Sequence, residues 1–179
     1  MPELIQPVAR VHLSFLAAVQ EFLAEGRGQA SDRTMLGRET QKYGGTWSTP
    51  AGFAAYVEAI KADALPETPR AEGIVPATTL WYVDGDEYLG RLSIRHQLTE
   101  FLLEQGGHIG YDVRPSARRR GHATAMLKSA LPITHALGID PVLVTCDNDN
   151  VGSRKVIEAS GGVLEDERVG KLRFWVPTG

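Results

Sequence analysis

The chain has 179 residues, of which 42% are hydrophobic and 23% charged, a composition typical of a folded globular domain rather than a disordered chain. Nineteen Lys and Arg against 22 Asp and Glu give a formal charge of −3, which argues against a nucleic-acid binder that works by bulk charge. The single cysteine, Cys146, excludes an internal disulfide framework and a clustered-thiolate site for zinc or iron–sulfur. No apolar run approaches the roughly 20 residues that span a bilayer, and the start carries no signal-peptide pattern. We therefore expect one cytoplasmic domain over residues 1–179, with no membrane partner.

Two helices are predicted in the first third of the chain. Residues 8–25 place Val11, Phe15 and further apolar side chains on one stripe, and Gly26 follows as a stop signal. Residues 27–45 are polar and glycine-rich, which predicts a loop with at most a short helix. Thr49-Pro50 is a typical start for a second helix, because Thr can cap the helix and Pro fits its first turn.

The rest of the chain alternates between strand and helix patterns. A connecting loop is expected at 65–76, strands at 78–83 and 88–94 around an Asp84-Gly85 hairpin turn, a helical turn at 100–105, a strand at 107–113, a helix from 123 to about Gly138, a strand at 141–146, a helix at 150–160 and closing strands at 163–164 and 172–176. Pro132 should bend or weaken the long helix, because it leaves the Lys128 carbonyl without its usual donor. This order of elements predicts a mixed α/β layer fold.

The segment from Gly106 to Ala123 carries the chemistry. A strand ends, a loop with Arg114, Arg118, Arg119 and Arg120 follows, and a helix begins with small residues. Main-chain N–H groups in the first turn of a helix lack internal partners, and the helix dipole places partial positive charge there. Because Gly121 and Ala123 leave this backbone accessible, the segment predicts a seat for a phosphate or pyrophosphate group.

We compared this segment with three known sequence patterns of phosphate-binding loops. A Walker A loop ends in Gly-Lys-Ser/Thr, which is not present here, and no G-x-G-x-x-G spacing follows the strand. The pattern R/Q-x-x-G-x-G/A is matched by Arg118, Gly121 and Ala123. It resembles the coenzyme A pyrophosphate loop of the GCN5-related N-acetyltransferase (GNAT) superfamily. An ordinary basic loop before a surface helix is the structural alternative.

The neighbouring elements strengthen this resemblance. The superfamily has a short strand after the loop's helix and then a helix that begins N-x-x-A/S, as residues 142–146 and Asn150-Val151-Gly152-Ser153 do here. The longer sequence, from about Val75 to Val176, is similar to one uncharacterised branch of predicted acetyltransferases. The strings that carry this similarity include Gly90-Arg91-Leu92-Ser93-Ile94-Arg95-His96, Val144-Thr145-Cys146-Asp147-Asn148 and Arg173-Phe174-Trp175-Val176.

The resemblance implies a GNAT-type α/β fold with a central, mostly antiparallel twisted sheet, one splayed strand pair and about four flanking helices. It implies acetyl-CoA as co-substrate, with no metal. Strand 110–113 should part from its neighbour, Tyr111 should line the resulting groove, and Val113 should offer backbone groups to the pantetheine amides. The pyrophosphate should be cradled by Arg118, Arg119, Arg120, Gly121, His122 and Ala123. Asn150 and Ser153 should lie beside the pantetheine arm or the phosphates, although Asn150 is equally suited to cap its helix.

The catalytic residues are less clear from the sequence. Many superfamily members place a general-acid Tyr seven residues after the Asn of N-x-x-A/S, and that position is Ile157 here. The strand positions at which better-characterised members carry Glu or His fall at Gly107 and Ile109. This leaves two candidates: His108, which faces the other side of a regular strand unless a bulge re-aims it, and Tyr111. Each of the two is equally explained as a structural residue of the strand.

Several other residues are weaker candidates for the site. Arg95 and His96 follow a strand toward the expected substrate side and are candidates to contact the acceptor. Cys146 is expected to be a small buried strand residue rather than a nucleophile, because its acidic neighbours would not lower its pKa. A final set of aromatic residues fits either an acceptor cleft or, more often, a core: Tyr43, Trp47, Phe53 and Trp81.

The sequence therefore predicts an acetyl-CoA-dependent N-acetyltransferase in which a primary amine attacks the thioester directly. The acceptor would be a small molecule or a peptide, and the acidic balance mildly suits a cationic one. The alternative is a non-catalytic acyl-CoA-binding module that lost its acid at Ile157. A nucleic-acid patch at 114–120 is a third interpretation, but that segment lacks interleaved aromatic residues and no nucleic-acid partner is expected. A homodimer is left open.

Overall fold

The computed structural model describes residues 1–29 and 31–179, and its strands form one seven-stranded sheet in the order β1-β2-β3-β4-β5-β7-β6. The strands are β1 (Glu3–Ile5), β2 (Ala77–Asp84), β3 (Glu87–Arg95), β4 (Ile109–Val113), β5 (Val142–Asp147), β6 (Val163–Arg168) and β7 (Lys171–Val176). All neighbours pair antiparallel except β4 and β5, which are parallel. The sheet thus takes strands from both ends of the chain.

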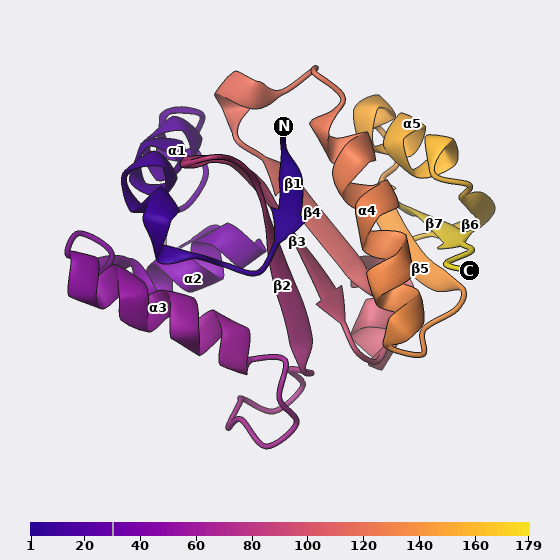
Figure 1. Ribbon diagram of the computed structural model, residues 1–179. Helices are drawn as coiled ribbons and strands as arrows, with labels where there is room; N and C mark the ends of the chain where they lie inside the picture. The colour runs from indigo at the N-terminus through magenta and orange to yellow at the C-terminus, as the bar shows by residue number, and fades with distance from the viewer. Residues whose placement is uncertain (30) are drawn as a thin grey trace.

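Helices cover both faces of the sheet (Figure 1). On one face lie α1 (His12–Ala24), α2 (Met35–Tyr43) and α3 (Pro50–Ala62). On the other lie α4 (His122–Ala136) and α5 (Val151–Ala159), which pack beside each other. Short 3₁₀ turns and one π-helical turn (Leu102–Gly106) connect these elements. None of the described helices is long and apolar enough to cross a membrane.

Each face of the sheet has its own hydrophobic core, because successive strand residues point to opposite faces. Leu80 and Tyr82 of β2 pack with α4 and α5, whereas Trp81 and Val83 of the same strand pack with α1 and α3. The second core is largely aromatic, with Phe15 at its centre in contact with several rings. It contains three of the four aromatic residues considered for an acceptor cleft, namely Trp47, Phe53 and Trp81.

The elements confirm the predicted α/β order, with one strand added, since the short β1 pairs with β2. The short helix allowed for in the polar stretch 27–45 is α2, which gives five α-helices in the described chain rather than about four. α2 buries only Leu36 and Gly37, so its sequence lacks a continuous apolar stripe. α4 continues past Pro132 to Ala136 and closes, as predicted, at Gly138, which adopts a φ of +82°.

The parallel pair β4–β5 is the main irregularity of the sheet. The strand register aligns only Ile109 with Val144, whereas β3 follows β4 along its full length. β4 and β5 therefore part after Ile109, as the predicted splay requires.

Candidate active site

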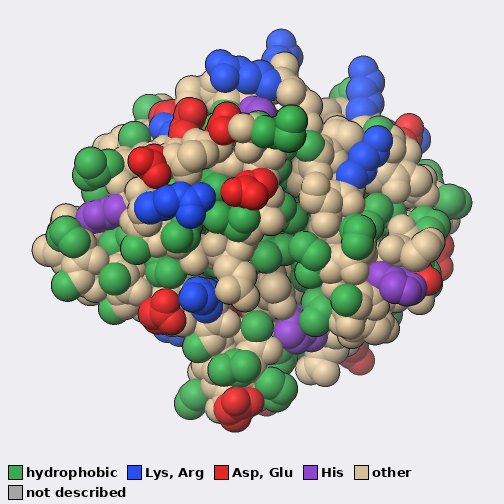
Figure 2. All heavy atoms as spheres, viewed as in Figure 1, with side chains coloured by type: hydrophobic (Ala, Val, Ile, Leu, Met, Phe, Trp, Pro, Cys, Tyr) green, Lys and Arg blue, Asp and Glu red, His purple; other side chains and the backbone are tan. Residues whose placement is uncertain are grey.

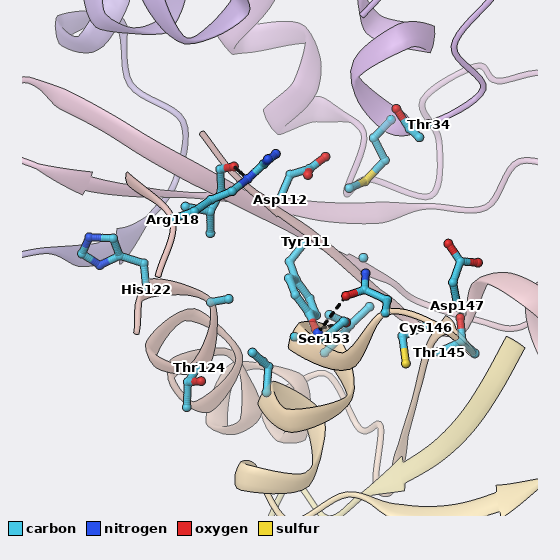
Figure 3. A pocket seen from close by; sticks show the side chains of 18 of the residues that line it. Thr34, Tyr111, Asp112, Arg118, His122, Thr124, Thr145, Cys146, Asp147 and Ser153 are labelled. Carbon is cyan, nitrogen blue, oxygen red and sulfur yellow. Dashed lines mark hydrogen bonds between the residues drawn. The ribbon is translucent and has the colours of Figure 1, made fainter. Parts of the chain in front are cut away.

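The parting of β4 and β5 opens a cleft of about 830 Å³. It is lined by β4, the loop that follows β4, the starts of α4 and α5, and the end of β5 (Figure 3). Candidate residues that the structure brings to this cleft are Tyr111, Val113, Arg118, Arg119, Gly121, His122, Ala123, Asn150 and Ser153. Arg120 and His108 do not line it.

Main-chain groups of β4 face this cleft. The N–H of Arg95 donates to the His108 carbonyl at 2.7 Å, and the N–H of Arg114 donates to the Leu89 carbonyl at 2.8 Å. In an antiparallel ladder every second residue bonds to a given neighbour, so the polar groups of Tyr111 and Val113 point away from β3. They point to the side that β5 has left, where an extended ligand with amide groups can pair with them.

The start of α4 offers a second set of free main-chain groups. The first bond within the helix runs from the Ala125 N–H to the Gly121 carbonyl at 3.0 Å, and no side chain caps this end. The N–H groups of His122, Ala123 and Thr124 consequently have no acceptor in the helix. Gly121 adopts a φ of +80°, and an added Cβ would meet no atom within 4 Å, so the space in front of the turn is open. This end of the helix suits a phosphate group.

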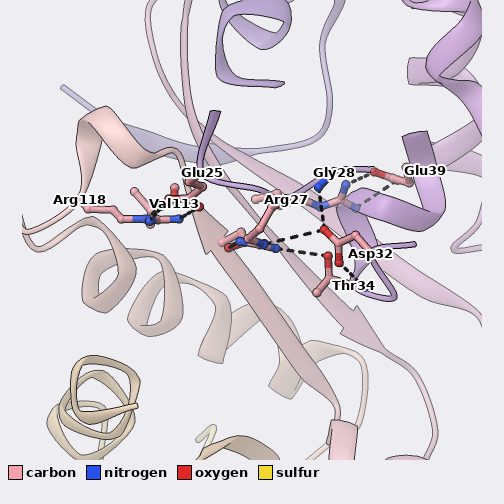
Figure 4. Close-up of polar contacts among 10 residues, drawn as sticks. Glu25, Arg27, Gly28, Asp32, Thr34, Glu39, Val113 and Arg118 are labelled. Atoms are coloured by element: carbon pink, nitrogen blue, oxygen red, sulfur yellow. Dashed lines mark hydrogen bonds and ion pairs between the residues drawn. The ribbon is translucent and has the colours of Figure 1, made fainter. Parts of the chain in front are cut away.

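Arg118 was expected to bind the pyrophosphate, but in the structure it contacts other residues of the protein. Its guanidinium pairs with Glu25 at the end of α1 through distances of 2.8 and 2.9 Å, and its Nε donates to the Val113 carbonyl at 3.1 Å (Figure 4). It therefore holds the loop in place and occupies one of the Val113 groups that were expected to bind pantetheine. Arg119 and Arg120 remain exposed on the loop, where Lys and Arg side chains gather at the top of Figure 2.

Further ion pairs attach the loop and β4 to the N-terminal segment. Buried Arg114 pairs with Glu21, whose other oxygen accepts the Ser116 N–H at 2.8 Å. Arg27 forms a two-pronged pair with Asp112 through distances of 3.0 and 2.9 Å. Two of the four arginines of the loop, Arg114 and Arg118, are thus paired with carboxylates in and just after α1, and these pairs fix the position of the loop.

Tyr111 and α5 meet across the cleft. The Tyr111 hydroxyl lies 2.6 Å from the Ser153 hydroxyl, and burial raises the pKa of the tyrosine to about 12 (Figure 3). The Asn150 Oδ1 accepts the Ser153 N–H at 3.1 Å, so Asn150 caps its helix and also lines the cleft. The His122 ring instead packs against Tyr82, with ring centroids 5.5 Å apart.

His108 is a buried link between β4 and β5. Its N–H donates to the Leu143 carbonyl at 2.8 Å, and its Nδ1 accepts the Leu143 N–H at 2.9 Å. Burial, with a contribution from Arg95, lowers the pKa of His108 to about 4. The neighbouring Gly107 has a φ of +65°, and an added Cβ would lie 2.6 Å from the Leu143 carbonyl. The structure therefore places His108 in the sheet as a neutral acceptor, outside the cleft.

The remaining candidates divide between core and cleft. Ile157 is fully buried in the core, so no side chain replaces the missing tyrosine from that position. Cys146 lines the cleft near the point where the strands meet, and burial raises the pKa of its thiol. His96 accepts or donates a hydrogen bond with Thr78 at 2.8 Å.

No group of three or more His, Cys, Asp or Glu able to hold a metal occurs in residues 1–29 or 31–179.

The N-terminal segment supplies one wall of the cleft that the sequence did not predict. Arg27, Thr34, Met35 and Arg38 line it beside Arg95 at the end of β3. None of these residues belongs to a recognisable motif, and their polar surroundings are typical of a loop. Arg27 could have been placed at the cleft only from its ion pair with Asp112, 85 residues away in the sequence. A single sequence does not specify such long-range pairs.

Comparisons with known proteins agree with this geometry. The family described as "Acetyltransferase (GNAT) domain" matches residues 30–163. No curated protein matches the chain. Similar solved structures include Mycobacterium smegmatis RimJ in complex with CoA-disulfide, with 18% identity and a TM-score of 0.63 over 98% of this chain and 81% of that one.

Two further solved structures share the fold. The microcin C7 self-immunity acetyltransferase MccE, in complex with acetyl-CoA and AMP, has 14% identity and a TM-score of 0.62 over 98% of this chain and 91% of that one. RimL, a ribosomal L7/L12 α-N-protein acetyltransferase in complex with coenzyme A bonded to a cysteine as a disulfide, has 14% identity and a TM-score of 0.60 over 97% and 92%.

The position of His108 gives a prediction about pH. Because its pKa is about 4 in the folded protein and near 6.5 in an unfolded chain, the unfolded state binds more protons between these values. The free energy of unfolding should therefore fall, by on the order of 2 kcal/mol, as the pH drops from about 6.5 to 4. A ring titration followed by NMR should give the low pKa directly. A His108 that titrates near 6.5 would contradict the buried link.

Proposed function

The chain belongs to the GNAT acetyltransferase family and is an acyltransferase, and we propose that it transfers the acetyl group of acetyl-CoA to a primary amine by direct attack on the thioester. One observation carries the proposal. The cleft connects two sets of unpartnered main-chain groups, those of Tyr111 and the Val113 N–H on β4 and those at the start of α4. An amide-containing arm that ends in a diphosphate matches both sets.

Each part of this cleft has a role in the proposal. The N–H groups of His122, Ala123 and Thr124 bind the pyrophosphate, assisted by the exposed charge of Arg119. Tyr111 and Val113 pair with the pantetheine arm through their backbones. The reacting end then lies where the strands meet, near Cys146.

The proton of the attacking amine leaves through water in this scheme. Glu25 and Asp112, two of the carboxylates that line the cleft, are held in ion pairs with Arg118 and Arg27. His108 is neutral and lies outside the cleft. The rate should therefore follow the free-amine fraction of the acceptor, which rises tenfold per pH unit below the pKa of the amine.

Tyr111 assists the departing sulfur as a hydrogen-bond donor. Its pKa of about 12 keeps the phenol protonated at neutral pH, whereas a thiol has a pKa near 8.5. Full proton transfer from Tyr111 to the thiolate would be uphill by several kcal/mol, so the phenol stabilises the negative charge without giving up its proton. Ser153, 2.6 Å away, orients this hydroxyl.

The cytoplasmic location and the homodimer stay predictions, as does the choice between a small molecule and a peptide. RimL is described as acetylating the α-amine of a ribosomal protein, which supports a peptide or protein amine as one candidate class of acceptor. The alternative of a non-catalytic acyl-CoA-binding module rests on the buried Ile157 and is tested by thiol release from acetyl-CoA.

Replacing Gly121 tests the pyrophosphate seat. In Gly121→Val a branched side chain would enter the open space before α4 and resist the φ of +80°, so we expect at least a tenfold loss of CoA affinity, about 1.4 kcal/mol, by calorimetry. Gly138→Val is the matched control, because Gly138 has a φ of +82° and open space at the other end of the same helix. It should bind CoA normally. Equal affinity of both variants would exclude the seat.

Replacing Tyr111 tests catalysis rather than binding. Incubation with acetyl-CoA and a panel of amines, polyamines, amino acids and peptides should release free thiol with one amine class. Tyr111→Phe should lower kcat about 5- to 20-fold, as expected for one lost donor to a developing charge, and change CoA affinity less than twofold. Ser153→Ala should have a smaller effect of the same kind. CoA binding by the wild-type protein without thiol release from any amine would favour the binding module.

A further inference from the structure

A second cavity, of about 390 Å³, adjoins the cleft on the N-terminal side of the sheet. Met35, Arg38 and Arg95 line both spaces, so the two meet at these side chains. An added Cβ on Gly110 would lie 3.4 Å from the Met35 Cε and 3.5 Å from the Arg95 Nη2. The junction is therefore next to the residue at which β4 leaves β5, which is the proposed reacting end of the cleft.

The floor of this second cavity is polar, although it is the inner face of a central sheet. Thr79, Arg91, Ser93 and Arg95 line it, and the first three of these are buried. The opposite face of the same strands carries Leu80, Leu92 and Ile94 in a hydrophobic core. The three buried groups are partnered within the protein, since Thr79 hydrogen-bonds to Ser93 at 3.0 Å and Arg91 pairs with Glu39. Arg95 is the member of this floor that has no carboxylate partner among the described residues.

The charges around this cavity do not balance. Its lining includes five cationic side chains and two carboxylates: Arg38, Lys42, Arg70, Arg91 and Arg95 against Glu39 and Asp63. Both carboxylates are already used, since Glu39 pairs with Arg91 and accepts the Tyr56 hydroxyl, and Asp63 lies 3.5 Å from Arg70. Among the described residues, no carboxylate of the cavity lining forms a salt bridge with Arg38 or Arg95.

Arg95 is the most informative of these cations. Its Nη1 donates to the carbonyls of Gly106 and Gly107 at 3.0 and 3.1 Å, while Nη2 lies toward Gly110 and Met35, where no acceptor from the described residues meets it. Burial, with repulsion from Arg38 and Arg91, lowers the pKa of Arg95 to about 10. A partly buried guanidinium that is repelled by two others and faces no free carboxylate is electrostatically prepared for an anion.

We propose that the second cavity holds the acceptor and that Arg38 and Arg95 bind an oxyanion, a carboxylate or a phosphate, that the acceptor amine carries. This inference rests on the proposed acetyltransfer and names its substrate class. Apolar side chains on the cavity wall, among them Ile60, Ile74 and Phe101, accommodate an apolar body on the same small molecule. The acceptor is thus an anionic amine, although the net charge of the chain suggested a cationic one.

The test compares acceptors that differ only in the anion. Alanyl-phenylalanine and its C-terminal amide present the same amine with and without a carboxylate, and phosphoethanolamine with ethanolamine does so for phosphate. We expect kcat/KM to be at least about tenfold higher for the anionic member of one pair, as for a charge-assisted hydrogen bond to a desolvated partner. Which pair responds distinguishes carboxylate from phosphate. Equal or lower values for the anionic member of both pairs would overturn the proposal.

Arg38→Gln is the variant of choice, because Arg38 is exposed and bonds to no described carboxylate, whereas a change at Arg95 would also release the Gly106 and Gly107 carbonyls. The preference for the anionic acceptor, taken as the ratio of the two kcat/KM values within the variant, should fall to less than about threefold. Arg33→Gln is the matched control, since Arg33 is exposed and lines neither cavity. It should keep the wild-type preference.

A binding measurement separates this inference from the proposed function. Calorimetry with the acetylated dipeptide and its amide, in the presence of CoA, reports the anion site without turnover. Tighter binding of the carboxylate form by wild type than by Arg38→Gln would support the site even if no amine were acetylated, in which case the proposed function alone would fail. The same comparison is made with N-acetyl-phosphoethanolamine and N-acetylethanolamine. Equal binding of the anionic and neutral members of both pairs by the wild type would overturn the anion site while leaving acetyltransfer intact.

Discussion

The site depends on one interruption in a hydrogen-bonded sheet. β4 keeps its ladder with β3 along its whole length but shares only one register position with β5. Main-chain N–H and C=O groups in a protein interior are almost always paired, so a strand edge left open inside a sheet is costly unless something else pairs with it. At Val113 the Arg118 side chain supplies part of that pairing, and the rest of the edge faces the cleft. The sheet is therefore incomplete in a way that an extended amide ligand completes.

The edge stays open because both strands are fixed from outside. His108 bonds to Leu143 through both its main-chain N–H and its ring, which joins the strands at the point where they meet. Beyond that point, Glu21, Glu25 and Arg27 hold β4 and the following loop to the end of α1. These pairs are only partly buried and contribute little net stability, so they specify geometry more than they stabilise it. The cleft is preformed by contacts with the N-terminal segment, which lies outside the binding motif.

The sequence predicted the parts of this arrangement that are local. The loop pattern at Arg118, Gly121 and Ala123 requires only the φ of one glycine and the open end of one helix, and both are encoded within a few residues. The strand and helix order from β2 to β7 followed equally from periodicity and turn residues. Helix α2 was expected only as a short helix within a loop, because it buries two residues, and β1 was missed because three residues carry no periodic signal.

The parts that could not be predicted are long-range. The motif predicts Arg118 as a phosphate ligand, whereas the fold places Glu25 beside it as an ion-pair partner. The sequence indicates His108 as the one near-neutral base on its strand. In the structure Gly107 has a positive φ, and the ring of His108 bonds to Leu143 instead. The cationic second cavity combines residues of α2, β3 and the 68–75 loop, each ordinary in its own context. These residues form a site only because the fold brings them together across the sheet.

Amide hydrogen exchange upon addition of CoA tests the central claim most directly. If CoA completes the open edge, the N–H groups of Tyr111, Val113 and His122 to Thr124 should exchange at least about tenfold more slowly in the complex, while the amides that β3 and β2 share should not change. Unchanged exchange on β4 and at the start of α4, at CoA concentrations that saturate the protein, would show that the ligand lies elsewhere and would contradict this account.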